Sequence, residues 1–263
     1  MSNTDPFAPD ASGATLSAIV KNLERRWGVT LVSFLPETQE QVHAVQLQRE
    51  ISKLWNGQAE DSMRQGRLYI EFYEPHHFHC THFTLTRSDP SGPVKADSFT
   101  KEDHRQFELF EIIHGATSQT QPIEVAFDRL SIAHDRLGIV LFGECVGEDA
   151  ARYRRTLLEN LNSALPASFN LSPRPWDKDH SEFHKLHCSL GYLKRPVPQG
   201  YSAFVDEIKR IEFAPLSFTL EDVALVHHRY RTLAPPQEGG ITFPLGKEVD
   251  LTEDEFVRKL NLT

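Results

Sequence analysis

The sequence has few cysteines and no long apolar run. Its three cysteines, Cys80, Cys145 and Cys188, are too few and odd in number for a disulfide framework, so we expect a reducing, cytoplasmic setting. No stretch of about 18 apolar residues occurs, and no membrane-spanning helix is expected. The polar start from Met1 to Ala14 lacks the charged-then-apolar plan of a secretory leader.

Basic residues are in the minority. The chain has 28 lysines and arginines against 37 aspartates and glutamates, a formal net charge of −9. A protein that wraps a long phosphate backbone usually carries a basic excess. The acidic balance therefore favours a small substrate, or only the end of a longer nucleic acid, bound in a local basic pocket.

Several phosphate- and metal-binding motifs are missing from the sequence. There is no glycine-rich phosphate loop, no Gly-x-Ser-x-Gly nucleophile elbow and no Cys-x-x-Cys pair. These absences weaken three interpretations: a nucleoside-triphosphate enzyme, a serine esterase and a structural zinc domain.

The remaining composition is that of a folded globular protein. The chain has 263 residues, of which 39% are hydrophobic and 25% charged, which is enough to bury a sizeable core. We expect residues 1–14 to form a flexible tail and residues 15–263 a single bilobal domain. Strand and helix patterns mix throughout the chain, which predicts an α+β (mixed α/β) fold.

Local patterns predict individual elements. A strand is expected at 29–35, followed by a helix to about Trp55 that begins at a capping box of Thr38 and Gln41. A second helix is expected from about Thr100 to Gly115. The other expected elements are strands at 68–73, 78–86, 123–132, 138–145, 186–193, 218–228 and 241–245, and helices at 148–165 and around 204–211.

One segment of the sequence is echoed later in the chain. Phe78-His-Cys-Thr-His-Phe-Thr-Leu-Thr-Arg87 resembles Leu186-His-Cys-Ser-Leu-Gly-Tyr-Leu-Lys-Arg195, and the two histidines, His79 and His187, are 108 residues apart. This separation is too long for a solenoid repeat. It suits two related lobes that each present one copy at a shared surface.

The repeated His-x-Thr/Ser can carry acid–base chemistry. Alternate side chains of a strand share a face, so each histidine lies beside a hydroxyl residue: His79 beside Thr81, and His187 beside Ser189. One neutral histidine can remove a proton from an attacking water or hydroxyl, while the other, protonated, supplies a proton to the leaving oxygen. The hydroxyls can donate hydrogen bonds to phosphoryl oxygens, so the set suits cleavage of a phosphodiester without a metal or other cofactor.

These motifs resemble those of the 2H phosphoesterase superfamily. Pro75-His-His-Phe-His-Cys-Thr81 is similar to the first family motif with its usual Pro-x-x-apolar lead, and Leu186-His-Cys-Ser-Leu190 is similar to the second. The order of elements from Val29 to Leu245 also fits. The resemblance implies a bilobal fold of two pseudo-symmetric lobes, each with an antiparallel sheet and flanking helices, and an active site in the cleft between them. It implies His79 and His187 as the acid–base pair, with Thr81 and Ser189 as phosphate binders.

A second frame for the first motif stays open. The family usually has an apolar residue after the first threonine, and this chain has His82 there. The alternative pair is His82 and Thr84, which would place Phe83 in the core. The apolar lead and the internal echo favour the frame that begins at His79.

Other residues are weaker candidates for substrate binding, and each has an ordinary structural explanation. They could line the site, or they could be solvated charges, a turn histidine and packing aromatics: His77, Lys185, Arg87, Arg195, Tyr192 and Trp176. The crowded histidines of 76–82 could suggest zinc, but His79 and His82 would point to opposite faces of one strand, so no metal site is expected.

The resemblance implies a metal-independent phosphodiesterase that hydrolyses a cyclic, 2′,3′-type, or 2′-linked phosphodiester. The expected substrate is a nucleotide or an RNA end, handled by a monomer with no membrane partner. A binding module or sensor without turnover, and a ligase that runs related chemistry in reverse, remain the alternatives.

Overall fold

The computed structural model describes residues 27–62, 70–87, 105–132, 138–164, 183–193, 201–229, 232–233 and 240–261. Within these ranges the chain is α+β, as expected from the mixed pattern of the sequence. The described strands are β1 (Trp27–Phe34), β2 (Ile70–Phe72), β3 (His79–Arg87), β4 (Ile123–Ile132), β5 (Gly138–Cys145), β6 (Lys185–Leu193), β7 (Leu216–Leu220), β8 (Asp222–Arg229), β9 (Thr232–Leu233) and β10 (Ile241–Pro244).

Helices and one short 3-10 turn connect these strands. The described helices are α2 (Gln39–Ser62), the 3-10 turn η1 (Pro75–His77), α3 (Arg105–Ser118), α4 (Glu148–Ala164), α5 (Tyr201–Arg210) and α6 (Glu253–Asn261). Two expected helix ends are wrong, because α2 continues beyond Trp55 and α3 continues through Gly115. The sequence reading did not include α6.

The ten described strands form one antiparallel sheet, in which eight follow a path of two four-stranded halves. The order is β10-β8-β1-β3-β6-β5-β4-β7, with β2 beside β6 and β9 beside β8. The two halves join where β3 meets β6, through the residue pair Cys80 and Cys188. The two sheets expected for two lobes are therefore the halves of a single sheet, with each echoed segment on an inner edge.

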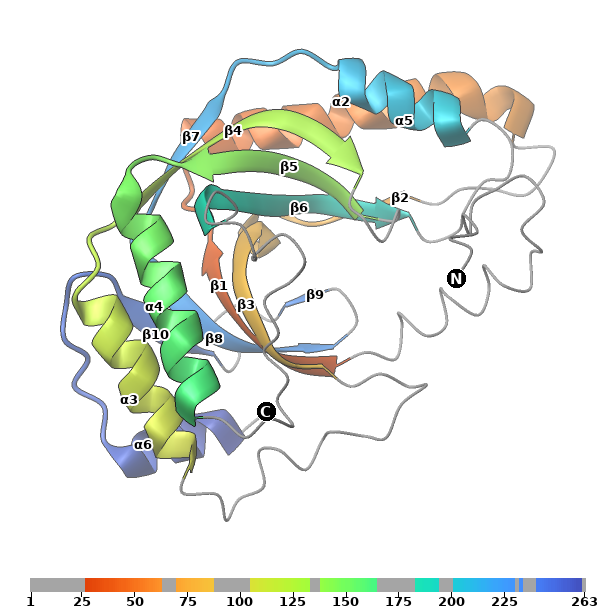
Figure 1. The fold of residues 1–263 in the computed structure, drawn as a ribbon. Helices are drawn as coiled ribbons and strands as arrows, with labels where there is room; N and C mark the ends of the chain where they lie inside the picture. The colour runs from red at the N-terminus through yellow and green to blue at the C-terminus, as the bar shows by residue number, and fades with distance from the viewer. Residues whose placement is uncertain are drawn as a thin grey trace, which may run out of the picture.

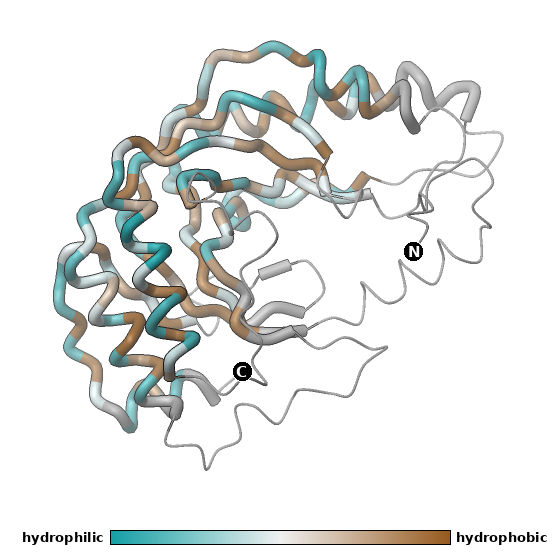
Figure 2. The backbone as a smooth tube through the Cα atoms, in the orientation of Figure 1, coloured by the Kyte–Doolittle hydropathy of each residue, from teal (hydrophilic) through white to brown (hydrophobic). Residues whose placement is uncertain are grey.

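The helices lie in two groups against this sheet. Figure 1 shows α2 and α5 together over the β4–β5–β6 half and α3, α4 and α6 together beside the other half. Contacts of α5 with β4, and of α3 and α6 with β10, agree with this division. Figure 2 shows brown, apolar segments along both the strands and the helices. The main core contains Cys80, Cys188, Leu31 and Leu141.

The strand expected at 218–228 is wrong, because it is two strands. The exposed Glu221 interrupts the strand, because β7 ends just before it and β8 begins just after it. These two strands lie in different halves, β7 at the end of one and β8 within the other. A single-residue connection between them requires the sheet to curl strongly, which brings the halves toward each other.

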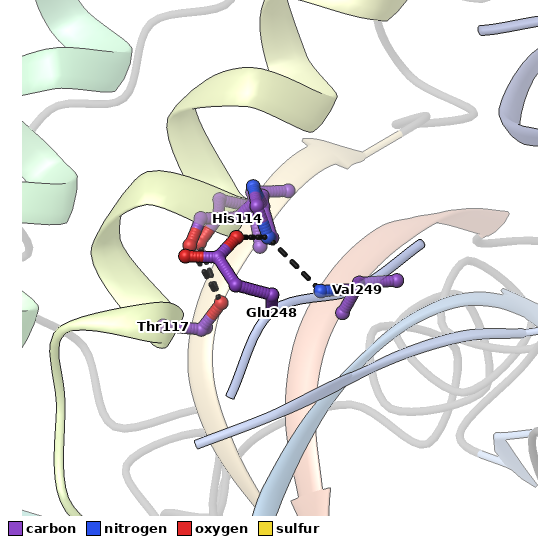
Figure 3. A network of polar contacts seen from close by, with 5 residues as sticks. His114, Thr117, Glu248 and Val249 are labelled. Carbon is purple, nitrogen blue, oxygen red and sulfur yellow. Dashed lines mark hydrogen bonds and ion pairs between the residues drawn. The ribbon is translucent and has the colours of Figure 1, made fainter. Parts of the chain in front are cut away.

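The segment that follows β10 is tied to α3 by polar contacts (Figure 3). The Val249 N–H donates to Nε2 of His114 over 3.1 Å, and the Glu248 carboxylate lies 2.9 Å from the same nitrogen. The Gly246 N–H donates to the carbonyl of Thr117 over 3.0 Å, and Gly246 has φ +71°, a conformation that favours glycine. These contacts position α6 at the end of the chain.

None of the helices in the part of the chain described by the structure is both long and apolar enough to span a membrane.

Candidate active site

The junction of the two half-sheets gathers the residues of the repeated motif. In the antiparallel register, Cys80 of β3 pairs with Cys188 of β6, and both cysteines are buried in the core. The neighbours of each cysteine therefore point to the opposite face of the sheet. We call this the histidine face, and its four central residues are His79, Thr81, His187 and Ser189.

The pairing of the cysteines also fixes which of these residues are neighbours. In an antiparallel register, His79 stands opposite Ser189, and Thr81 stands opposite His187. The two histidines are then diagonal neighbours, positions that lie about 7–8 Å apart in an antiparallel sheet. That spacing lets two imidazole rings approach one small group from both sides.

The ring of His79 is held in one orientation. Its Nδ1 lies 2.7 Å from the carbonyl oxygen of His77, which can only accept a hydrogen bond, so Nδ1 carries the proton and Nε2 has a free lone pair. Only 8% of the residue is exposed, and this burial lowers the pKa of His79 to about 4. The backbone bond to His77 opposes the shift but is the smaller effect. His79 is therefore neutral near pH 7.

Each histidine lies beside a phenylalanine from the next strand outward. Phe34 of β1 pairs with His79, and Phe142 of β5 pairs with His187. Both pairs of ring centroids are 6.1 Å apart. The similarity of the two lobes therefore extends beyond the motif strands to their neighbours.

This extension of the similarity is visible in the sequence, although it was not among the predicted features. Leu31-Val-Ser-Phe34 matches Ile139-Val-Leu-Phe142 at a separation of 108 residues, the same as for the two histidines. A search for further matches at that fixed separation would have found it.

Both motif strands carry a bulge at the same place. On β3 the register passes from Thr81 to Phe83, and on β6 it passes from Ser189 to Gly191. The extra residue is His82 in one strand and Leu190 in the other, so each bulge comes three residues after the motif histidine. A bulge lets two consecutive side chains lie on the same face. Phe83 can therefore enter the core while His79 and Thr81, which precede the bulge, stay on the histidine face.

His82, the alternative first-motif histidine, lies on the core side. It is 2% exposed, and its Nε2 is 2.8 Å from Oγ of Ser33. Its ring meets Tyr153 of α4 edge-on, with the centroids 5.8 Å apart. Burial, and secondarily the charge of Arg154, lower the pKa of His82 to about 3. Thr84, the partner in that frame, lies further along β3.

Two buried glutamines of α2 hold the segment that leads into His79. The Gln48 amide donates to the carbonyls of Tyr73 and Leu190, each over 2.8 Å, and so links that segment to β6. The Gln41 amide donates to the carbonyl of Pro75 over 3.2 Å and to that of Leu35 over 3.4 Å. The expected capping box is therefore wrong, because the Gln41 side chain bonds the carbonyls of Leu35 and Pro75 rather than the backbone N–H of Thr38. Sequence reasoning did not single out Gln48.

A buried arginine holds the start of the second motif strand. Arg154 of α4 is 4% exposed, and its Nη1 donates to the carbonyls of Phe183 and Lys185 over 2.6 and 3.0 Å. Its guanidinium also lies over the rings of Phe83 and Phe183, 5.6 and 5.9 Å from their centroids. The helical pattern of the sequence does not reveal this contact.

Tyr192 lies on the histidine face and also packs against the main core, as expected of a packing aromatic. The bulge at Leu190 changes the alternation, so the register pairs Tyr192 with Glu71 of β2. The Tyr192 hydroxyl donates to Oε2 of Glu71 over 2.7 Å. Its ring is 5.9 Å from that of Tyr73, which is in turn 6.3 Å from the ring of His79.

The other candidates lie at the ends of these elements or outside the described residues. His77 closes η1, half-buried, and its ring packs 4.0 Å from that of His76. Lys185 opens β6 with an exposed side chain, and Arg87 closes β3. Trp176 and Arg195 are outside the residues that the structure describes.

Among the described residues, no three His, Cys, Asp or Glu side chains come together as a set of metal ligands.

No family model and no curated protein matches the chain. Among solved structures, the chain is similar to TT0787 of Thermus thermophilus, with 18% identity over 84% of this chain and 99% of that chain and a TM-score of 0.49. It is also similar to Kluyveromyces marxianus Usb1, with 13% identity, 85% and 99% coverage and a TM-score of 0.45.

The structure of E. coli LigT complexed with NADP+ is a third similar structure, with 13% identity over 84% of this chain and 99% of that chain and a TM-score of 0.39. At these identities the likeness to the three structures is a likeness of fold.

Proposed function

We propose that this protein is a metal-independent phosphodiesterase of the 2H type. Its substrate is a cyclic, 2′,3′-type, or 2′-linked phosphodiester of a nucleotide or an RNA end, handled by a monomer. The observation that supports the proposal is the pairing of Cys80 with Cys188. The residues on either side of these two cysteines are both histidines and both hydroxyl residues, and strand alternation gives them a common face.

His79 is the general base in this reaction. Its Nδ1–H is engaged by a backbone carbonyl, so the lone pair of Nε2 is available to accept a proton. Its low pKa keeps it neutral at physiological pH, the state that a base requires. A phosphodiester anion bound beside the ring favours the protonated form and raises this pKa toward a value better suited to proton transfer.

His187 is the general acid. It is half-buried and stands diagonally across from His79. In hydrolysis, the oxygen of a water molecule bonds to phosphorus while its proton passes to Nε2 of His79. The bond from phosphorus to the ribose oxygen breaks, and that oxygen takes the proton of His187. Return of one proton to His187 and loss of one from His79 restore the starting state.

Thr81 and Ser189 bind the phosphoryl oxygens. Each hydroxyl residue stands opposite the histidine of the other strand, so the two flank the same group. Their O–H groups can donate to the non-bridging oxygens as negative charge builds up on them. This assigns a role to all four residues of the repeated motif.

The test is hydrolysis of a 2′,3′-cyclic mononucleotide in the presence of excess chelator. We expect turnover that is insensitive to chelator, with a bell-shaped dependence of rate on pH from one basic and one acidic histidine. His184→Ala is the matched control. It removes a half-buried histidine three residues before His187, and that histidine lies 3.7 Å from Glu148 at the periphery.

Three other outcomes would overturn the proposal. Tight binding of the nucleotide without turnover would indicate a sensor. Loss of activity in chelator, restored by one divalent metal, would indicate a metalloenzyme. Joining of RNA ends without hydrolysis would indicate a ligase.

A further inference from the structure

An exposed arginine lies in line with His187 on the histidine face. The register pairs Arg129 of β4 with Phe142 of β5, and Phe142 in turn with His187 of β6. Residues paired across antiparallel strands share a face. The three side chains therefore form a row that leads away from the acid–base pair.

The guanidinium of Arg129 rests on the ring of Phe142. Its Cζ lies 5.3 Å from the ring centroid, and the same ring is 6.1 Å from that of His187. Arg129 is exposed, and no ion pair among the described residues involves it. One side of the planar Arg129 guanidinium thus packs on the Phe142 ring, and its other side is accessible to a ligand.

The opposite side of the site has a different character. Two residues beyond the pair of Val32 and Ala224, the same β1–β8 register brings Asp222 beside Phe34. The equivalent pair on the other side of the site is Arg129 beside Phe142. Val32 and Ala224 are buried and form a small apolar cluster with Val226. Both motif histidines have a phenylalanine beside them, but among the residues that the structure describes a cation covers that ring only on the His187 side.

We propose that Phe142 and Arg129 form the binding site for the base of the substrate nucleoside, on the leaving-group side of the phosphate. This inference rests on the proposed function, in which His187 protonates the leaving oxygen. The base stacks on the guanidinium plane, which Phe142 supports from below. Unpaired bases commonly stack on arginine planes and aromatic rings in this way.

The arrangement orients the substrate. The ribose oxygen that leaves the phosphorus faces His187, and its nucleoside extends over Phe142 toward Arg129. The attacking water then comes from the His79 side, where Asp222 and the small apolar cluster offer no cation for a second phosphate. Stacking on a guanidinium and a ring discriminates weakly among bases, because every base has a π-face.

The inference is tested by binding, with a nucleoside 3′-monophosphate and inorganic phosphate as probes, measured by calorimetry. Arg129→Ala should weaken binding of the nucleotide by about 5- to 150-fold, the range for loss of one base-stacking contact, and should leave binding of inorganic phosphate unchanged. Arg129→Lys keeps the charge but loses the planar surface, so it should behave like the alanine variant.

Arg152→Ala is the matched control. It removes an exposed arginine from α4, where that side chain pairs with Asp149. It changes the net charge by the same amount as Arg129→Ala and should leave both affinities unchanged.

Each alternative result contradicts the inference. Equal weakening of both probes by Arg129→Ala, or full rescue by lysine, would make Arg129 a phosphate ligand. Unchanged binding of both probes, or wild-type protein that binds the nucleotide no more tightly than phosphate, would mean that no nucleoside site exists there. These results are independent of the turnover assay, which tests the proposed function itself.

Discussion

At the scale of the residue, two histidines three positions apart on β3 have opposite environments. His79 belongs to the histidine face with its Nε2 available, while His82 is buried against Ser33 and Tyr153. Both have a lowered pKa, and burial is the main cause in each case. Position on the sheet, rather than titration, therefore distinguishes the proposed base from a packing residue.

The first prediction compares the alanine variants of these two histidines. His79→Ala should lower the catalytic rate by about 10²- to 10⁴-fold, the usual effect of losing an acid–base group. His82→Ala should retain far more activity and lose about 1–3 kcal/mol of stability, because it removes a buried ring that packs against Tyr153 and its hydrogen bond with Ser33. The measurements are the rate on a 2′,3′-cyclic nucleotide and the melting temperature.

The opposite pattern would shift the assignment. An inactive but well-folded His82→Ala beside an active His79→Ala would move the base to His82, with Thr84 as its partner.

The second prediction concerns stability and pH. Both histidines have a lower pKa in the folded state, about 4 for His79 and about 3 for His82, than the ordinary value of 6.5. The unfolded chain therefore binds protons more readily. Stability should be highest above about pH 6.5 and should fall as the pH decreases toward those values, by up to about 1.4 kcal/mol per pH unit for each histidine.

Urea unfolding at pH 7.5 and pH 5 measures this effect. His82→Asn should remove the share of the slope that belongs to His82. A variant with the full wild-type slope would contradict the burial of a neutral His82.

At the scale of the element, the two bulges explain what strand alternation could not predict. If side chains alternated strictly along β3, Cys80 and Phe83 would point to opposite faces of the sheet. Only one of them could then lie in the core, so only one of the two motif frames, His79 or His82, could hold. The bulge at His82 admits both to the core. The bulge at Leu190 similarly moves Tyr192 to the histidine face. Neither extra residue is a glycine or proline that would reveal the bulge in the sequence, so these placements come only from the pairing of strands.

The third prediction tests the close approach of β2 to β6. A Cβ at Gly191 would lie 2.6 Å from the carbonyl oxygen of Glu71, which is backbone and cannot easily move. Gly191→Ala should therefore separate the strands and destabilise the protein by about 1–3 kcal/mol, as overpacking commonly does. Thermal unfolding is the measurement.

Gly115→Ala is the control. It introduces the same methyl group within α3, where a Cβ would meet nothing within 4 Å. Replacing a glycine inside a helix should stabilise by about 0.5–1 kcal/mol. If Gly191→Ala were as stable as Gly115→Ala, the close packing of β2 on β6 would be contradicted.

At the scale of the whole molecule, the sequence predicts the class of fold and the pairing of the two motifs. The echo at a separation of 108 residues indicates two related halves, and the structure has two half-sheets that meet at the echoed strands. The merging of the halves into one sheet was not predictable, since strand order is a matter of long-range pairing. For the same reason, the contacts of Gln48 and Arg154 with β6 could not be read from their helices.

The central claim is that the two halves contribute one acid–base unit, and a double-mutant cycle tests it most directly. Hydrolysis of a 2′,3′-cyclic nucleotide is measured in chelator for His79→Ala, His187→Ala and the double variant. Each single change should lower the rate by about 10²- to 10⁴-fold, and the double change should cost little more than one, because residues that act as a unit are strongly non-additive. Single variants that keep near wild-type rates, or losses that multiply in the double variant, would contradict a shared two-histidine centre.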